Sequence, residues 1–294
     1  MTHHDGLTFV KLACVRVERI LPSDEAYALM DLTREIAERE LAPRAAGFES
    51  RGEFPRDVIR TVGRAGLLGL PYAESDGGGG QPYEVYLQVL EILAGSWLAI
   101  AEAVSVHTLS CFPVAEYGTE RQRKLLPELL GGDLLGAYCL SEPQGGSDAG
   151  ALATRAVRAG DEYVVTGTKA WITHGGRADF YAVFCRTGGP GAAGISCLLA
   201  DADTPGLLPQ PPERTMGLWS SAPAQIVFDG ARSRRTGWSA ARVPGSRLRC
   251  GRWTPAGSAS PRARSGWPRR RSTTRPGTRA SGNSSAGRSW SSRA

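Results

Sequence analysis

The stretch CLSEPQGGSDAGA, from Cys139 to Ala151, packs carboxylates, a proline, two adjacent glycines and serine hydroxyls into one short run. The sequence on its two sides follows different periodicities. From Ser23 to about Leu135 the signals are helical, whereas from about Gly136 short β-rich runs alternate with Gly and Asp turns. We therefore predict that the polar run lies in a loop where a helical domain meets a β domain.

The helical half begins with a capping signal. Ser23 can cap a helix whose first turn carries two acidic residues, which lie favourably against the helix dipole. Apolar residues follow at helical spacing up to Ile36, and the run Ala42–Arg44, which contains a proline, is expected to end this helix.

Further helices are expected up to residue 135. One begins with Pro55 at its first position. The apolar segment Tyr86–Phe112 is interrupted by Glu91 and Glu102, which predicts a buried core helix rather than a membrane span. A short amphipathic helix capped by Thr119 follows.

The glycine run Gly77–Gly80 invites comparison with a phosphate-binding loop. It lacks the Lys-Ser/Thr pair of a P-loop and does not follow a predicted strand. A connection between helices is the better interpretation.

The β half is predicted from short runs separated by turns. A hairpin is expected to turn at Gly160-Asp161, and further strands are expected over residues 179–187, 194–201 and 224–230. The predicted fold class is α+β, with an N-terminal all-α domain followed by a small antiparallel β-barrel domain and a C-terminal tail that is irregular or disordered. The expected division is an irregular extension over 1–22, the helical domain over 23–135, the β domain over 136–231 and the tail over 232–294.

Charge is distributed unevenly along the 294 residues, whose net charge is +6. From Arg232 onward there are 16 arginines and no Lys, Asp or Glu, so residues 1–231 carry 19 basic residues and all 29 acidic ones, a net charge of −10. The body of the chain is therefore typical of an ordinary, mildly acidic protein, and the Arg/Ser/Pro/Gly-rich tail is typical of disordered sequence.

The six cysteines are scattered, without a C-x-x-C pair or metal-ligand spacing. We expect buried free thiols in a reducing compartment, no metal site and a cytoplasmic location. The first residues do not follow the pattern of a signal peptide.

With its polar run at a helix-to-sheet junction, the chain closely resembles the acyl-CoA dehydrogenase family. The family signature, small-aliphatic-Ser/Thr-Glu-x-x-small-Gly-Ser/Thr-Asp, is satisfied throughout by Cys139–Asp148. The run GTKAWITHGG, from Gly167 to Gly176, resembles the second flavin-contacting segment of the family, which usually has Asn in place of His174. The resemblance covers roughly residues 23 to 231.

The resemblance implies α,β-dehydrogenation of a fatty acyl-CoA thioester by FAD, with electrons passed to an electron-transfer flavoprotein. A cofactor of this kind performs the hydride transfer itself, while the protein orients the reactants and supplies the electrostatic environment. Family members are homodimers or homotetramers, and neither a specific nucleic acid nor a membrane is implied as a partner. The implied flavin-contacting residues are Tyr138, Cys139, Leu140, Ser141, Gly146, Ser147, Trp171, Ile172 and Thr173, of which Ser147 would also touch the acyl-CoA and Thr173 would point its hydroxyl at the hydride-accepting nitrogen.

Several of the polar and aromatic residues have a structural interpretation as well. Glu142 can simply cap and shape its loop, Trp171 can be ordinary core, and His174 can be a turn or surface residue. His107, on an apolar helix, is expected to be a core histidine with satisfied hydrogen bonds rather than a ligand.

The resemblance places the catalytic carboxylate in a C-terminal four-helix domain, so no residue of this sequence is assigned as the base. The tail can be re-read one base early to give family-like strings over residues 233–246 and 278–287. We therefore expect that residues from about Ser233 onward are translated out of frame, and that the chain as written is inactive.

Two alternatives to an acyl-CoA substrate stay open within the same superfamily, a carrier-protein-bound acyl group and a flavin monooxygenase reaction. From a different class comes a non-catalytic protein whose arginine-rich tail binds nucleic acid by charge alone.

Overall fold

The computed structural model describes residues 20–160 and 162–233. The predictions for the N-terminal extension before residue 20 and for the tail beyond Ser233, including its reading frame, lie outside these residues. The described residues fall within one compact unit of the chain.

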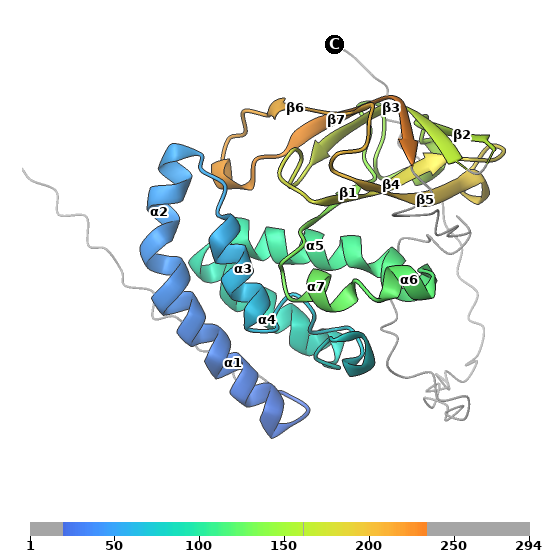
Figure 1. Cartoon of the computed structure of the whole chain (residues 1–294). Helices are drawn as coiled ribbons and strands as arrows, with labels where there is room; N and C mark the ends of the chain where they lie inside the picture. The colour runs from blue at the N-terminus through green and yellow to red at the C-terminus, as the bar shows by residue number, and fades with distance from the viewer. Residues whose placement is uncertain (1–19, 161, 234–294) are drawn as a thin grey trace, which may run out of the picture. The chain divides into compact units, whose positions relative to one another are not determined.

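A long helical rod opens the described part. Helix α1 (Asp24–Ile36) is capped as expected by Ser23, whose side chain accepts from the Ala26 amide over 3.2 Å. It continues through a π-helical turn (Ala37–Leu41) into α2 (Ala42–Arg51), and Figure 1 shows α1 and α2 in line. The prediction that the Pro43 run ends the helix is wrong, because Pro43 enters α2 in its first turn, where a missing amide hydrogen costs little.

Three helices follow, and the long apolar segment forms two of them. Helix α3 (Arg56–Arg64) begins after Pro55, and α4 (Tyr83–Ser96) and α5 (Leu98–Tyr117) are separated by Trp97, which has an extended backbone. By length and hydropathy α5 alone among the described helices could cross a membrane, but 67% of its most apolar window is buried inside the protein, which is typical of a core helix.

Two short helices, α6 (Glu120–Arg123) and α7 (Leu126–Leu130), complete the helical half. Thr119 caps α6 as predicted, within a capping box that Gln122 completes. The connection over Gly77–Gly80 is a turn, confirming that interpretation. Each of its four amides donates to a backbone carbonyl, which leaves none of them for a phosphate.

The β half is a curled seven-stranded sheet, a half-barrel (Figure 1), in the order β1-β4-β2-β3-β7-β6 with β5 beside β4. The pairing is antiparallel as predicted, except that β1 runs parallel to β4 and one residue pair joins β2 to β4 in parallel. Its strands are β1 (Gly136–Cys139), β2 (Arg155–Ala159), β3 (Glu162–Ile172), β4 (Phe180–Arg186), β5 (Ile195–Asp201), β6 (Leu207–Pro212) and β7 (Ala224–Ser233).

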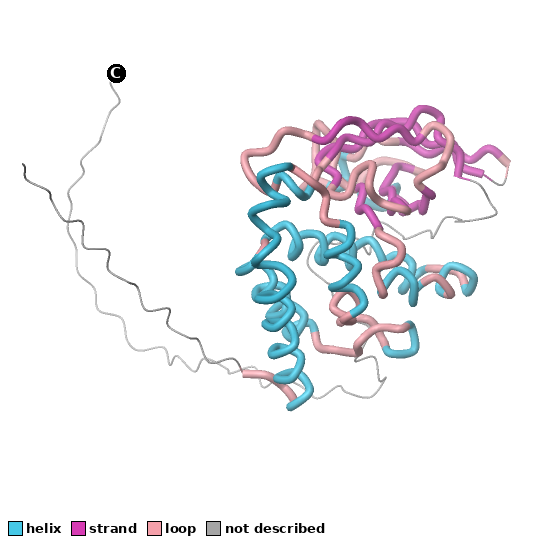
Figure 2. Tube along the Cα trace, turned by 60° about the vertical axis from the view of Figure 1, so that its left-hand side comes forward, coloured by secondary structure: helices cyan, strands magenta, loops and turns pink. Residues whose placement is uncertain are grey.

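Strand β4 is buried on both faces because it lies between two cores. Phe180, Ala182 and Phe184 pack against residues of α5 and α7, while Tyr181 and Val183 pack with β1 and β7 on the other face. Figures 1 and 2 show the sheet along one side of the helices, and Figure 1 shows α5 directly beneath it. Helix α5 therefore supports the part of the sheet from which the loop after β1 leaves.

An arginine clamp fixes the junction between the two halves. Arg56, at the start of α3, donates to the carbonyls of Asp133 and Arg177 and to the carboxylate of Asp179. Asp179 in turn accepts from the Leu135 amide over 2.6 Å. The chain thus enters β1 from a position held by both halves.

Candidate functional site

The run Tyr138–Ser141 leaves β1 with alternating burial. The ring of half-buried Tyr138 lies 4.7 Å from that of Phe184 between centroids. Cys139 is fully buried, and burial raises the pKa of its thiol to about 12, so it stays a thiol. Leu140 and Ser141 are half-buried. This strand end thus presents apolar surface together with the hydroxyl of Ser141.

Glu142 is buried at 1% exposure and meets the equally buried Lys169 of β3, whose Nζ lies 2.7 Å from Glu142 Oε1. Burial alone would raise the pKa of Glu142, but hydrogen bonds from Lys169, Thr154 and Ala153 outweigh it and lower that pKa. The structural interpretation of Glu142 is confirmed, since its carboxylate shapes the loop. Lys169 was not predicted from the sequence as a partner of this loop.

The glycine pair of the signature forms a tight turn. Glu142 and Gly145 exchange two backbone hydrogen bonds, of 2.7 and 3.0 Å. A Cβ on Gly146 would lie 3.3 Å from Ser141 Oγ, closer than ordinary contact. Ser147 is exposed, and Asp148 accepts from the Gly150 amide over 3.1 Å. Small residues here keep the backbone close to Ser141 and leave Ser147 open to solvent.

The second segment, at the end of β3, exposes an aromatic ring. Trp171 is 59% exposed and has a φ of 55°, an uncommon backbone conformation for a bulky residue, so its interpretation as ordinary core is wrong. Ile172 beside it is buried. The two segments lie together, because the Ala170 amide donates to the Ser141 carbonyl over 3.0 Å.

Thr173 donates its hydroxyl proton to Oε1 of Glu102 on α5 over 2.9 Å. The other carboxylate oxygen of Glu102 is buried and has no hydrogen-bond partner among the described residues. From the sequence, Glu102 indicates only that the apolar segment is not a membrane span. A carboxylate in the first half of a predominantly apolar helix was the signal for a polar role.

Both histidines near this site are buried. His107 Nε2 lies 2.6 Å from the Leu129 carbonyl and its Nδ1 accepts from the Gly136 amide, so the expected core histidine is confirmed. His174 does lie in a turn, with a φ of 66°, but it is fully buried rather than on the surface. It contacts the Gly136 carbonyl through Nδ1 over 2.9 Å.

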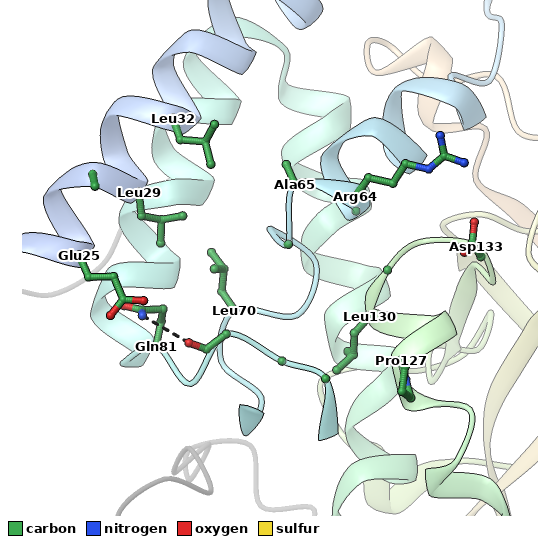
Figure 3. Close-up of a pocket in the computed structure, with 17 residues that line it drawn as sticks. Glu25, Leu29, Leu32, Arg64, Ala65, Leu70, Gln81, Pro127, Leu130 and Asp133 are labelled. Carbon is green, nitrogen blue, oxygen red and sulfur yellow. Dashed lines mark hydrogen bonds between the residues drawn. The ribbon is translucent and has the colours of Figure 1, made fainter. Parts of the chain in front are cut away.

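A separate pocket of about 570 Å³ lies on the helical half, away from these residues. Leu29 and Leu32 of α1, Leu70 and Leu130 line it, and Glu25, Arg64 and Asp133 lie at its sides (Figure 3). None of the residues that the resemblance assigns to the flavin lines this pocket.

Among the described residues, Cys111, Cys139, Cys185 and Cys197 are buried free thiols, and no group of three potential metal-binding side chains is present. The candidate site consists of the loop after β1, the exposed Trp171 and the carboxylate of Glu102 on α5.

Comparison with known proteins gives a consistent family. The sequence models for the acyl-CoA dehydrogenase N-terminal domain and for the acyl-CoA dehydrogenase middle domain match residues 23–133 and 137–231. An acyl-CoA dehydrogenase of Bacillus subtilis (strain 168) is 36% identical over 212 residues, which cover 71% of this chain and 56% of that protein.

Solved structures agree. The crystal structure of a probable acyl-CoA dehydrogenase from Mycobacterium abscessus superposes with a TM-score of 0.70 at 35% identity, covering 76% of this chain and 60% of that one. A glutaryl-CoA dehydrogenase from Mycobacterium smegmatis in complex with FADH2 gives 0.68 at 28% identity, covering 74% and 55%. The chain spans 55–60% of the length of these relatives.

Proposed function

The chain belongs to the acyl-CoA dehydrogenase family, and from this premise we propose that the whole protein catalyses the FAD-dependent α,β-dehydrogenation of an acyl-CoA thioester. The observation that carries the proposal is the contact between the two signature segments, Cys139–Asp148 and Gly167–Gly176. The Ala170 amide joins the loop after β1 to the end of β3, which presents Trp171 to solvent beside Thr173.

The residues at this junction fit a flavin. An isoalloxazine ring needs an apolar or aromatic wall and a few directed polar groups, and when bound FAD supplies hydride acceptance from the β-carbon of the substrate. We assign the wall to Trp171, Tyr138 and Leu140. Ser141 and Thr173 would supply hydroxyls, and the unpartnered buried oxygen of Glu102 marks a polar position that a ligand or water would satisfy.

The remaining contacts belong to the loop and to buried supports. Cys139 and Ile172 are buried and would act through their backbone, Gly146 permits close approach of a ligand, and exposed Ser147 would touch both FAD and the acyl-CoA. In this proposal the α-proton is removed by a carboxylate outside the described residues.

Partners and location are part of the same proposal. An electron-transfer flavoprotein would receive the electrons, and the protein would assemble as a homodimer or homotetramer. The four described cysteines are buried free thiols, which is compatible with a reducing compartment such as the cytoplasm.

Flavin titration followed by reduction tests the proposal. The purified chain is titrated with FAD while flavin fluorescence is followed, with Trp171→Ala as the matched variant. Acyl-CoAs of increasing length and an acyl carrier protein thioester are then added anaerobically, and flavin bleaching is recorded. Saturable binding that Trp171→Ala weakens supports the flavin site, and bleaching by one thioester class identifies the substrate. FAD binding that Trp171→Ala leaves unchanged contradicts the assigned site.

A further inference from the structure

The loop after β1 is held by a buried ion pair. Lys169 of β3 is 0% exposed, and its Nζ donates to Glu142 Oε1 over 2.7 Å and to the Leu140 carbonyl over 2.9 Å. An unpaired buried charge is costly, so each partner requires the other. Removing one partner leaves the charge of the other unpaired in the protein interior.

The carboxylate of Glu142 also ties the far end of the loop. It accepts from the backbone amides of Ala153 and Thr154, over 2.7 and 3.0 Å, and from the side-chain amide of Gln144 over 2.5 Å. The two ends of the segment 142–154 therefore meet at one side chain. The fourth donor to this carboxylate is Lys169.

Two consecutive residues of β3 donate hydrogen bonds to three consecutive residues of the chain that leaves β1. Lys169 binds Leu140 and Glu142, and the amide of Ala170 binds the carbonyl of Ser141 over 3.0 Å. The next residue of β3 is Trp171, whose side chain is exposed. The bonds from residues 169–170 thus fix the loop relative to the tryptophan.

From this arrangement we propose that Lys169 is a positioning residue, which holds the loop 140–154 in register with Trp171 and Thr173 before any ligand binds. The proposal rests on the proposed function, because the surface so fixed is the assigned flavin site. A preorganised loop loses little conformational freedom on binding, which raises affinity.

An apolar pair could fill the same volume, but it could not replace these bonds. A methionine and a leucine would leave the Leu140 carbonyl and the Ala153 and Thr154 amides without their side-chain partners. Backbone groups that lose their partners at these partly or fully buried positions favour a rearranged loop. This difference separates positioning from mere stability.

The test compares Lys169→Met with the double variant Lys169→Met/Glu142→Leu in the full chain. Hydrogen–deuterium exchange of peptides covering residues 140–154 is measured without FAD, along with the melting temperature and the Kd for FAD. We expect exchange in the loop to rise at least tenfold in both variants. The double variant should regain melting temperature, because no unpaired charge remains, while its loop exchange stays high.

Leu93→Ala is the matched control, since Leu93 is fully buried in the helical core. It should lower the melting temperature and leave exchange in the loop unchanged. The proposal is overturned if Lys169→Met exchanges within twofold of the wild type, or if the double variant restores wild-type exchange. If the wild type fails to bind FAD, the proposed function fails, while the exchange comparison still decides the role of Lys169. Where FAD does bind, its Kd should rise at least tenfold in both variants, and an unchanged Kd overturns the link to the flavin.

Discussion

The backbone amide of Gly136 donates to His107 Nδ1 over 2.9 Å, so the first residue of the sheet is bonded to a histidine of the core helix. His107 must then carry its proton on Nε2, which donates to the Leu129 carbonyl. The carbonyl of Gly136 accepts from His174 over 2.9 Å, which leaves Nε2 of His174 as an acceptor. Two neutral histidines therefore hold one glycine between helix and turn.

This arrangement predicts loss of stability in mild acid. Burial lowers the pKa of His107 and His174 to about 4 from an ordinary 6.5, so the folded state excludes protons that the unfolded state binds. Stability is fully present above pH 6.5 and falls as the pH drops toward 4. Between pH 7 and 5 the loss is about 2 kcal/mol per histidine.

Urea unfolding at pH 7 and pH 5 measures this loss, and His174→Asn is the matched variant. Asn tolerates the positive φ and offers an amide donor, but it does not titrate. The loss between the two pH values should therefore be about halved. An equal loss in wild type and variant would show that His174 does not titrate as described.

Gly136→Ala should destabilise the junction by about 1–3 kcal/mol or more through overpacking. A Cβ at this position would lie 2.0 Å from Ser110 Oγ and 2.4 Å from the Phe180 ring. Gly95→Ala is the control, because Gly95 is exposed in α4 and has nothing within 4 Å of an added Cβ. That change should stabilise by about 0.5 kcal/mol. Equal effects of the two changes on thermal unfolding would contradict the close packing at Gly136.

Glu49→Ala should lower the free energy of unfolding by about 1–3 kcal/mol. Glu49 of α2 accepts from Trp97 Nε1 over 2.8 Å and from the hydroxyl of Ser220, which links the helical rod to the connection between β6 and β7. Glu53→Ala removes an exposed ion pair with Arg51 and should change stability by less than about 0.5 kcal/mol. Trp fluorescence during denaturation provides the measurement, and a Glu49 effect no larger than the Glu53 effect would show that the link is not stabilising.

Trp171→Ala should leave the melting temperature nearly unchanged and weaken FAD binding at least tenfold. Most of this side chain is exposed, so its removal loses little packing within the chain. Trp219→Ala is the matched control, since Trp219 is 52% exposed and belongs to neither signature segment. A melting temperature that falls sharply in Trp171→Ala would assign the residue to the fold instead of the ligand.

Local signals in the sequence were sufficient for much of the fold. Ser23 and Thr119 cap their helices because capping depends on residues within one turn. Strands β4, β5 and β7 follow from apolar runs between turns. Strand β6 was missed, because its prolines at 209, 211 and 212 are tolerated on a sheet edge that the sequence does not reveal.

Where the longer helical segments divide or continue depended on contacts with residues far away in the sequence. The apolar region 86–112 divides at Trp97, whose indole bonds to Glu49 on another helix. The first helix continues past Pro43 by way of a π-helical turn over Ala37–Leu41, which local periodicity does not predict. Propensity and periodicity carry no information about such partners.

By itself the sequence determined the order of the helical and β halves, the position of the signature loop between them and the family to which these motifs belong. The tertiary structure alone decided which buried polar groups pair: Lys169 with Glu142, Glu102 with Thr173, and Gly136 with its two histidines. These partners lie between 27 and 71 residues apart in the chain. Burial makes each bond obligatory, since an unpaired polar group in the interior costs free energy, but only folding brings the partners within reach.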